Sequence, residues 1–356
     1  MAQLEMRAGP AQRSTPPAAN DGDLPPTEVC ITVDTEFSIG GAFADPERYR
    51  PLSGELVDCA VDGRAEGLGF LLRTLREFRI PATFFVEVLQ SFYFGARPMR
   101  RIAEHIADQG HDLQLHLHPC WLRFRGEHWR HSATEDDSCA ARSRGELRMM
   151  IEFGLAQFSR WKLSPPIALR AGSFSCGHVV DQAMVECGIA LGSNIGLGVH
   201  QPAEPEYRLA SGSRMFDGVL EVPAFTYSAL RLPVGSRLRT MAITSTSWRE
   251  MEALLWLARR AAISPVVVLT HPFEFVKRSD FRFRELRRDH VNQRRLTRLL
   301  EFLSRNDGEF SATTFGASGT AWVAAGERPG PLLQPPAYLT LSRIAENALN
   351  TLVWQY

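Results

Sequence analysis

The chain has 356 residues, of which 44% are hydrophobic, enough to form a sizeable core in one large domain or two ordinary ones. Its 40 lysines and arginines balance its 40 aspartates and glutamates, so it lacks the basic excess typical of a nucleic-acid-binding protein, and no nucleic-acid partner is expected. The six cysteines include no CxxC pair, which argues against a structural zinc knot and favours a reducing compartment.

The N-terminal segment differs in composition from the rest. Residues 1–26 are rich in proline, alanine and polar residues, and they lack the apolar stretch of an export signal. We expect a disordered tail there. Because no run of about 18 apolar residues occurs in the chain, no transmembrane helix is expected, and a cytoplasmic location is the default expectation.

The first ordered segment is VCITVDTEFS, residues 29–38, in which apolar residues alternate as they do in a buried strand. It ends in two carboxylates two positions apart, Asp34 and Glu36. A single acid after a strand is usually a helix cap or a turn former. The pair alone is therefore only a weak indication of function.

Helical and strand patterns then alternate along the chain. Apolar periodicity and boundary residues predict helices at 68–78, 99–110, 146–161, 178–188, 245–262 and 285–304. The same criteria predict strands within 80–88, 113–118, 166–177, 189–196, 220–225, 264–275 and 310–315. Ser247 and Glu250 form a capping-box pair at the start of one helix. This order predicts an α/β fold with a parallel sheet or a (β/α) barrel.

The domain organisation follows from the absence of a proline- and glycine-rich linker in the middle of the chain. We expect one catalytic domain over residues 27–320 and a C-terminal extension over 321–356. The end of this extension is expected to form an amphipathic helix that packs on the domain or on a second chain rather than on a membrane, so a homo-oligomer is possible. The apolar residues of this helix are Leu339, Ile344, Leu349, Leu352 and Trp354.

Polar residues gather where the predicted strands end. His116 and His118 close the 113–118 strand, Arg170 lies at the end of the next one, and His271 follows the run VVVLT. Functional sites of (β/α) barrels gather at the carboxyl ends of the strands. Four strands that end in acids, histidines, an arginine and a histidine therefore favour a common site.

The His-x-His pattern is the strongest single signal. Two imidazoles two positions apart on a strand point the same way, about 7 Å from each other, which suits one metal ion such as zinc. The alternative for His116 and His118 is a solvated sheet edge, and a lone histidine such as His271 is more often structural. The combination with Asp34 and Glu36 favours a metal site.

Five segments, in this order, resemble motifs of the NodB-like polysaccharide deacetylases, which form carbohydrate esterase family four. ITVDTE resembles the first motif, a strand that ends in paired acids, and IPATFFV resembles the strand-two signature. GHDLQLHLHP resembles the metal-histidine motif, LRAGSFS the arginine motif and VVVLTHPFEF the final motif. The resemblance covers about residues 31–315 and implies an irregular or incomplete (β/α) barrel of the NodB-homology type.

The resemblance also implies an activity and roles for individual residues. Members of this family use a metal ion to hydrolyse an N-acyl group, usually N-acetyl, on a sugar. By position, Asp34 would be the general base and Glu36 a metal ligand. His116 would be the first histidine ligand, Arg170 would hold and tune Asp34, and His271 would be the general acid.

The sequence departs from the commonest family pattern in two places. The acids are usually adjacent aspartates, whereas here they are two apart and the second is Glu36, as in a branch with allantoinase-like and peptidoglycan-deacetylase-like members. The second histidine ligand usually lies four residues after the first, where this chain has Cys120. Strand geometry makes His118 our choice for the third ligand, and Cys120 is the alternative because a thiolate also binds zinc.

We therefore expect a carbohydrate N-deacetylase of cell-surface polysaccharide biosynthesis that uses a divalent metal ion, zinc by preference. Its expected substrate is an amino sugar, nucleotide-linked or lipid-linked. The alternatives are a hydrolase of another non-peptide amide, as in the allantoinase-like branch, and a non-catalytic carbohydrate-binding relative. The arginine-rich residues 277–298 are either a solvated helix face or a phosphate-binding rim.

Overall fold

The structure is a computed structural model that describes residues 24–126, 137–232 and 235–352. The tail expected at 1–26 lies outside the described residues except at 24–26, and Trp354 lies outside them as well. No helix in the described ranges has the length and apolar composition needed to cross a membrane.

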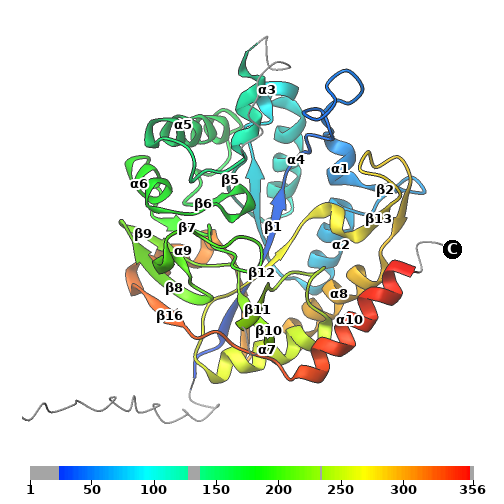
Figure 1. Ribbon diagram of the computed structural model, residues 1–356, viewed down its shortest axis with the longest axis vertical. Helices are drawn as coiled ribbons and strands as arrows, with labels where there is room; N and C mark the ends of the chain where they lie inside the picture. Colours follow the sequence, from blue (N-terminus) through cyan, green and yellow to red (C-terminus); the bar gives the residue numbers. More distant parts are fainter. Residues whose placement is uncertain (1–23, 127–136, 233–234, 353–356) are drawn as a thin grey trace, which may run out of the picture.

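A curled sheet of ten strands forms the centre of the molecule (Figure 1). β1, Thr27–Thr35, is the second strand in the sheet order. It has β12, Val266–Thr270, on one side and both β4, Thr83–Glu87, and β15, Phe310–Thr313, on the other, all parallel to it. From β4 the sheet continues in parallel through β5 Asp112–Leu117, β6 Ala168–Ala171, β7 Leu191–Gly192 and β9 Val219–Glu221. It ends in the antiparallel strands β8 Ser211–Phe216 and β16 Arg328–Gly330.

The segments around Phe225 and Met241 close the barrel against β12, the edge strand of this sheet, through hydrogen bonds instead of a regular strand pair. The amide of Phe225, shortly after β9, donates to the carbonyl of Val267 in β12 at 3.0 Å. The amide of Leu269 donates to the carbonyl of Met241, also at 3.0 Å. The sheet thereby curls into an incomplete (β/α) barrel, and the fold class expected from the sequence is confirmed.

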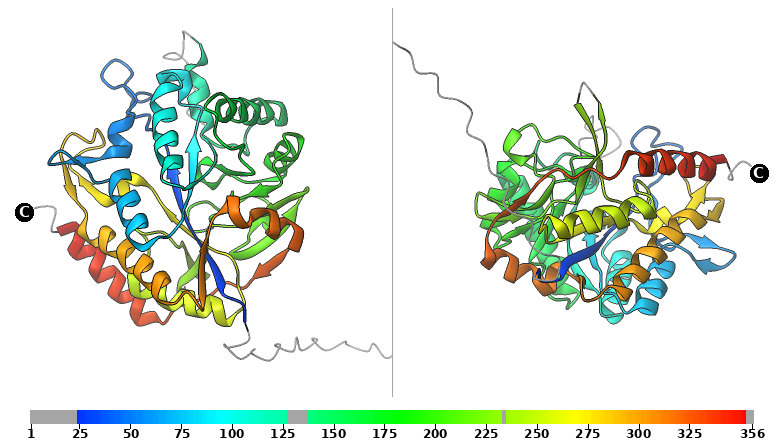
Figure 2. Two further views of the ribbon diagram at one scale, coloured as in Figure 1. Left: turned by 180° about the vertical axis from the view of Figure 1, so that it is seen from behind. Right: turned by 90° about the horizontal axis from the view of Figure 1, so that it is seen from below.

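Helices cover the outer face of the sheet (Figures 1 and 2). They are α2 Leu68–Phe78, α4 Arg97–Asp108, α5 Arg144–Arg160, α6 His178–Glu186, α7 Trp248–Arg260 and α8 His290–Arg305. The remaining elements are α1 Gly54–Asp58, α3 Ser91–Phe94, α9 Phe315–Ala325, α10 Ala337–Leu352 and the hairpins β2–β3 (Ala60–Val61, Arg64–Ala65), β10–β11 (Thr226–Leu232, Gly235–Thr240) and β13–β14 (Val276–Arg278, Leu286–Arg288). Short 3-10 turns cover Pro119–Arg125, Gly172–Phe174, Pro205–Tyr207 and Pro272–Phe275.

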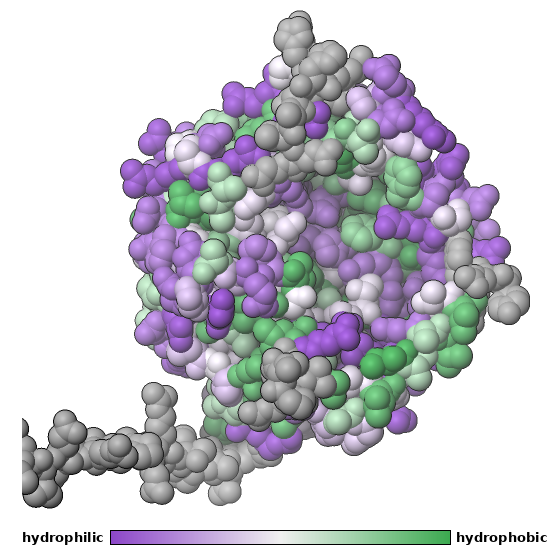
Figure 3. Space-filling view, in the orientation of Figure 1, coloured by the Kyte–Doolittle hydropathy of each residue, from purple (hydrophilic) through white to green (hydrophobic). Residues whose placement is uncertain are grey.

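The alternation along β1 separates an apolar outer face from an inner face. Val29, Ile31 and Val33 belong to the large core between the sheet and the helices. Cys30 points the other way, into a small apolar cluster that includes Phe315 of α9. The next positions on this inner side are Thr32, Asp34 and Glu36, so the barrel interior becomes polar toward the carboxyl end of β1. The face shown in Figure 3 is hollowed over this end.

The sequence located most elements, and the start of α8 is the clearest misplaced helix boundary. The helix expected at 68–78 is α2, Leu68–Phe78, and the capping box of Ser247 and Glu250 is present in both directions. The helix expected at 285–304 is α8, but its start was wrong, because α8 begins only at His290. The Asp289 side chain caps it, and the residues just before it form β14.

The C-terminal helix α10 contacts α7 and β10, but mainly through polar side chains. Nε of Arg343 lies 2.9 Å from Oε2 of Glu250 in α7, and both side chains are buried. Leu339 is buried, whereas Ile344 and Leu349, expected on the apolar face, are 51% and 62% exposed. The boundary expected at residue 320 falls inside α9, Phe315–Ala325.

Replacing Arg343 with methionine should destabilise the protein markedly. The carboxylate of Glu250 would be left buried without its cation, which costs about 3–5 kcal/mol of unfolding free energy. Urea unfolding of Arg343→Met beside Arg260→Met, the same change at an exposed arginine, measures this cost. Equal stabilities for the two variants would show that the ion pair does not hold α10.

Candidate metal and catalytic site

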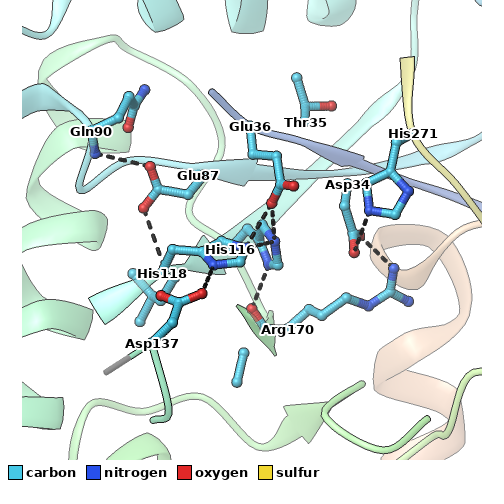
Figure 4. A network of polar contacts seen from close by, with 12 residues as sticks. Asp34, Thr35, Glu36, Glu87, Gln90, His116, His118, Asp137, Arg170 and His271 are labelled. Atoms are coloured by element: carbon cyan, nitrogen blue, oxygen red, sulfur yellow. Dashed lines mark hydrogen bonds and ion pairs between the residues drawn. The ribbon is translucent and has the colours of Figure 1, made fainter. Parts of the chain in front are cut away.

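The structure brings together all the polar residues that the strand ends singled out (Figure 4). Strand register explains the convergence: His116 in β5 pairs directly with Arg170 in β6, and Val33 in β1 pairs with Thr270 in β12. The residues that follow this last pair, Asp34 and His271, are therefore neighbours. The residues at this edge of the barrel are Asp34, Glu36, His116, His118, Arg170 and His271.

Three ligand atoms converge at one point of this edge. Oε2 of Glu36 lies 3.1 Å from Nε2 of His116 and 2.6 Å from Nε2 of His118. The two Nε2 atoms are themselves 3.1 Å apart. Glu36, His116 and His118 thus form a compact group that could hold a divalent metal ion.

The outer nitrogens of both histidines have acceptors. Nδ1 of His116 lies 2.7 Å from the carbonyl oxygen of Arg170, and Nδ1 of His118 lies 2.5 Å from Oδ2 of Asp137. Donation from Nδ1 leaves the lone pair of Nε2 available, which is the usual arrangement of histidine ligands and their supporting acceptors. The donor set therefore fits a metal ion.

Glu36 and His118 each stabilise the charged form of the other. Burial favours the neutral form of Glu36, but the neighbouring charge of His118 and hydrogen bonds from both histidines hold the pKa of Glu36 well below its usual range. Burial also disfavours a charged His118, yet Glu36 and Asp137 raise the pKa of His118 well above its usual value. Two carboxylates around one imidazole make this a position that attracts a cation.

Cys120, the alternative third ligand, lies to one side of the group. Its thiol clusters with His118 and Asp137 instead of with the Glu36–His116 pair. Burial and the carboxylate of Asp137 raise the pKa of the Cys120 thiol far above its usual value. Because the thiolate is the form that binds zinc, this geometry favours His118 as the ligand.

A second polar group surrounds Asp34, which the histidine pair does not contact. Nη1 of Arg170 donates to Oδ1 of Asp34 at 2.6 Å and to Oγ1 of Thr32 at 3.1 Å. Nη2 of Arg170 donates to Oγ of Ser193 at 2.9 Å. Arg170 is fully buried, so its charge depends on these partners.

His271 completes the edge beside Asp34. Its Nε2 lies 3.9 Å from Oδ2 of Asp34, and its Nδ1 lies 3.0 Å from Oε1 of Glu274. Burial lowers the pKa of His271, but the hydrogen bond and charge of Glu274, together with Asp34 and Glu36, outweigh it and raise this pKa to about 9. His271 is therefore protonated at neutral pH.

Sequence reasoning missed three acids that support this site. Glu274 follows His271 by three residues, a spacing that could have revealed it. Glu87 is fully buried at the end of β4, accepts hydrogen bonds from the amides that follow it and lies 3.4 Å from the amide of His118. Asp137 lies in an irregular segment, and no spacing rule points to it.

Comparison with known proteins places the fold. No protein-family model and no curated protein sequence matches the chain. A solved structure of a candidate polysaccharide deacetylase from Mycobacterium smegmatis matches with a TM-score of 0.54 and 17% identity, over 92% of this chain and 99% of that one. This likeness shows the fold: the chain has the incomplete barrel of the polysaccharide deacetylases, as its motifs led us to expect.

Two further solved structures are more distant. An acetyl xylan esterase of family 4 from Clostridium thermocellum, in complex with a cobalt ion, has a TM-score of 0.39 and 14% identity over 83% of this chain and 91% of that one. A pseudoenzyme of the CE4 family from Bacillus anthracis has a TM-score of 0.40 and 12% identity over 87% of this chain and 69% of that one. Both likenesses are too remote to bear on the chemistry of this site.

Removal of the Asp137 carboxylate should weaken metal binding without abolishing it. Asp137→Ala takes away the acceptor that orients His118, and loss of such a supporting group usually costs about 10–100-fold in metal affinity. Zinc affinity can be measured by competition with a chromophoric chelator, with the exposed Asp307→Ala as the matched control. Unchanged affinity in Asp137→Ala would mean that Asp137 does not position the ligand.

Proposed function

We propose that this protein is a metal-dependent hydrolase that removes an N-acyl group, in the simplest case N-acetyl, from an amino sugar. The main support for this proposal is that two separate sets of side chains lie at one edge of the barrel. Glu36, His116 and His118 converge as ligands, while Asp34 stands apart with His271 beside it. The deacetylase fold supports the same reaction class.

A divalent metal ion held by Glu36, His116 and His118, with zinc as the proposed ion, would polarise the substrate carbonyl and lower the pKa of a bound water toward about 7. Asp34 would then accept the proton of the attacking water. Its Oδ1 is fixed by Arg170, which leaves Oδ2 on the side of His271. A base positioned in this way contributes roughly 10²–10⁴-fold to the rate.

His271 would supply the proton that the leaving amine needs. Its Nδ1 is engaged by Glu274, so Nε2 is the nitrogen that faces Asp34 and the site. Its pKa of about 9 keeps the proton in place at neutral pH. The proposed base and the proposed acid thus stand next to each other, as hydrolysis of an amide requires.

We further propose a role in cell-surface polysaccharide biosynthesis, with a nucleotide-linked or lipid-linked amino sugar as substrate and a cytoplasmic place of action. The support is a basic surface that includes residues of the β13–β14 hairpin, which follows His271 in the chain. Lys277, Arg288 and Arg294 line a cavity between the β13–β14 hairpin, α8 and α10, where a phosphate group would find cationic partners.

The Asp34→Asn variant should lose roughly 10²–10⁴-fold in turnover while it keeps its metal, because Asp34 lies outside the ligand group. Acetate release from UDP-linked and lipid-linked N-acetyl sugars, with elemental analysis of the protein, measures both quantities.

Chelation should abolish activity and zinc should restore it. Unchanged turnover in Asp34→Asn would eliminate Asp34 as the base, and metal retained in both His116→Ala and His118→Ala would overturn the ligand assignment.

The pH profile should report the proton on His271. Since the protonated form is the active one, kcat should fall as pH rises through about 9. Glu274→Gln removes the largest attraction for that proton, so the alkaline limb should move to lower pH. The exposed Glu152→Gln serves as control and should leave the limb in place. If the limb stayed near pH 9 in Glu274→Gln, His271 would not be the group that titrates.

A further inference from the structure

The last helix of the described chain, α10, turns a mainly polar face toward the protein and an apolar face outward, which is the reverse of an ordinary surface helix. Its inward face carries Thr340 and Arg343, which are 3% and 4% exposed, and one buried apolar residue, Leu339. Its outward face carries apolar side chains that are more than half exposed. These are Tyr338 at 67%, Leu341 at 66%, Ile344 at 51%, Leu349 at 62% and Leu352 at 52%.

Directional polar contacts hold α10 in this orientation. Beyond the Arg343–Glu250 pair, Nη2 of the buried Arg295 donates to Oδ1 of Asn347 at 2.6 Å and lies 3.0 Å from Oε2 of Glu346. Near the end of the helix, Asn350 donates to the carboxylate of Asp289 at 3.0 Å. Rolling the helix to hide its apolar face would break all of these contacts, so the apolar face stays outward.

A basic cavity adjoins this face. The cavity has a volume of about 810 Å³, and Leu349 and Asn350 of α10 form part of its wall. Its basic lining residues outnumber the acidic ones, Asp62 and Glu346. The basic residues are Lys277, Arg287, Arg288, His290 and Arg294.

The apolar face of α10 and the hollow of the barrel lie on the same side of the molecule. Figure 3 shows hydrophobic side chains along α10 at the edge of the face whose centre is hollowed over the end of β1. A flat surface that covered the α10 face would therefore lie close to the opening of the candidate site.

We propose that the outward face of α10 docks this protein on a membrane surface that contains anionic phospholipid. The apolar side chains would enter the boundary between headgroups and acyl chains, while the basic cavity would receive lipid phosphates. A second copy of the chain fits less well, because a symmetric interface at this place would bring the same basic surplus from both partners together.

This docking has a consequence for the substrate, and that consequence rests on the proposed function. With α10 at the bilayer, the candidate site opens near the headgroup layer, where the sugar of a lipid-linked substrate would be presented. Docking itself requires no catalysis, so binding and activity can be tested separately.

Sedimentation of the full-length protein with lipid vesicles tests the docking. We expect the protein to pellet with vesicles that contain phosphatidylglycerol and to remain soluble with phosphatidylcholine alone. The double variant Leu341→Ser/Ile344→Ser should bind about tenfold more weakly or worse, and Arg294→Glu should also weaken binding. The double variant Val185→Ser/Val199→Ser removes two exposed valines elsewhere and should bind like the parent.

Several results would overturn the docking. The parent protein could stay soluble with both vesicle types, or vesicle binding could fall equally in the α10 variant and the valine control. Another is a dimer in sedimentation velocity that the α10 substitutions abolish, since a second copy would then cover this face. Acetate release from a water-soluble substrate should be unchanged in the α10 variant, so a failure of docking is distinguishable from a failure of the proposed reaction.

Discussion

The arrangement of the whole site at the barrel edge depends on the contacts of the buried Arg170 guanidinium. A fully buried cation must be paired and hydrogen-bonded, and here Asp34, Thr32 and Ser193 supply the partners. The guanidinium also lies 4.1 Å from the centre of the Phe85 ring. Because the carbonyl of Arg170 accepts from His116, one residue fixes both the proposed base and the first histidine ligand.

That arrangement gives two acids of one strand end two different environments. Asp34 and Glu36 both face the barrel interior, since they are two positions apart. Asp34 is bound by Arg170, whereas Glu36 is bound by the imidazoles of His116 and His118. If the two carboxylates had been in contact, their like charges would have favoured a single proton shared between them. The structure instead separates the carboxylate of Asp34, held by Arg170, from that of Glu36, which contacts the two histidines.

Much of this was predictable because it depends on local periodicity. Strand alternation put the two histidines on one face, the strand ends grouped them with Asp34 and Glu36, and the order of elements along the chain predicted the parallel barrel. Asp137 was not predictable, because an irregular segment has no period that tells where a side chain will point. The orientation of α10 escaped prediction for another reason. Periodicity shows that a helix has an apolar face, but the buried pair of Arg343 and Glu250 decides which face turns inward.

In the proposed site, Glu36, His116 and His118 hold the metal ion, while Asp34 remains outside its coordination. Anomalous scattering at the zinc edge, from crystals of the zinc-loaded protein, tests this most directly. We expect one peak bounded by Oε2 of Glu36 and Nε2 of both histidines, with Asp34 still bound to Arg170. A peak among His118, Cys120 and Asp137, or one that Asp34 coordinates directly, would rule out this ligand assignment.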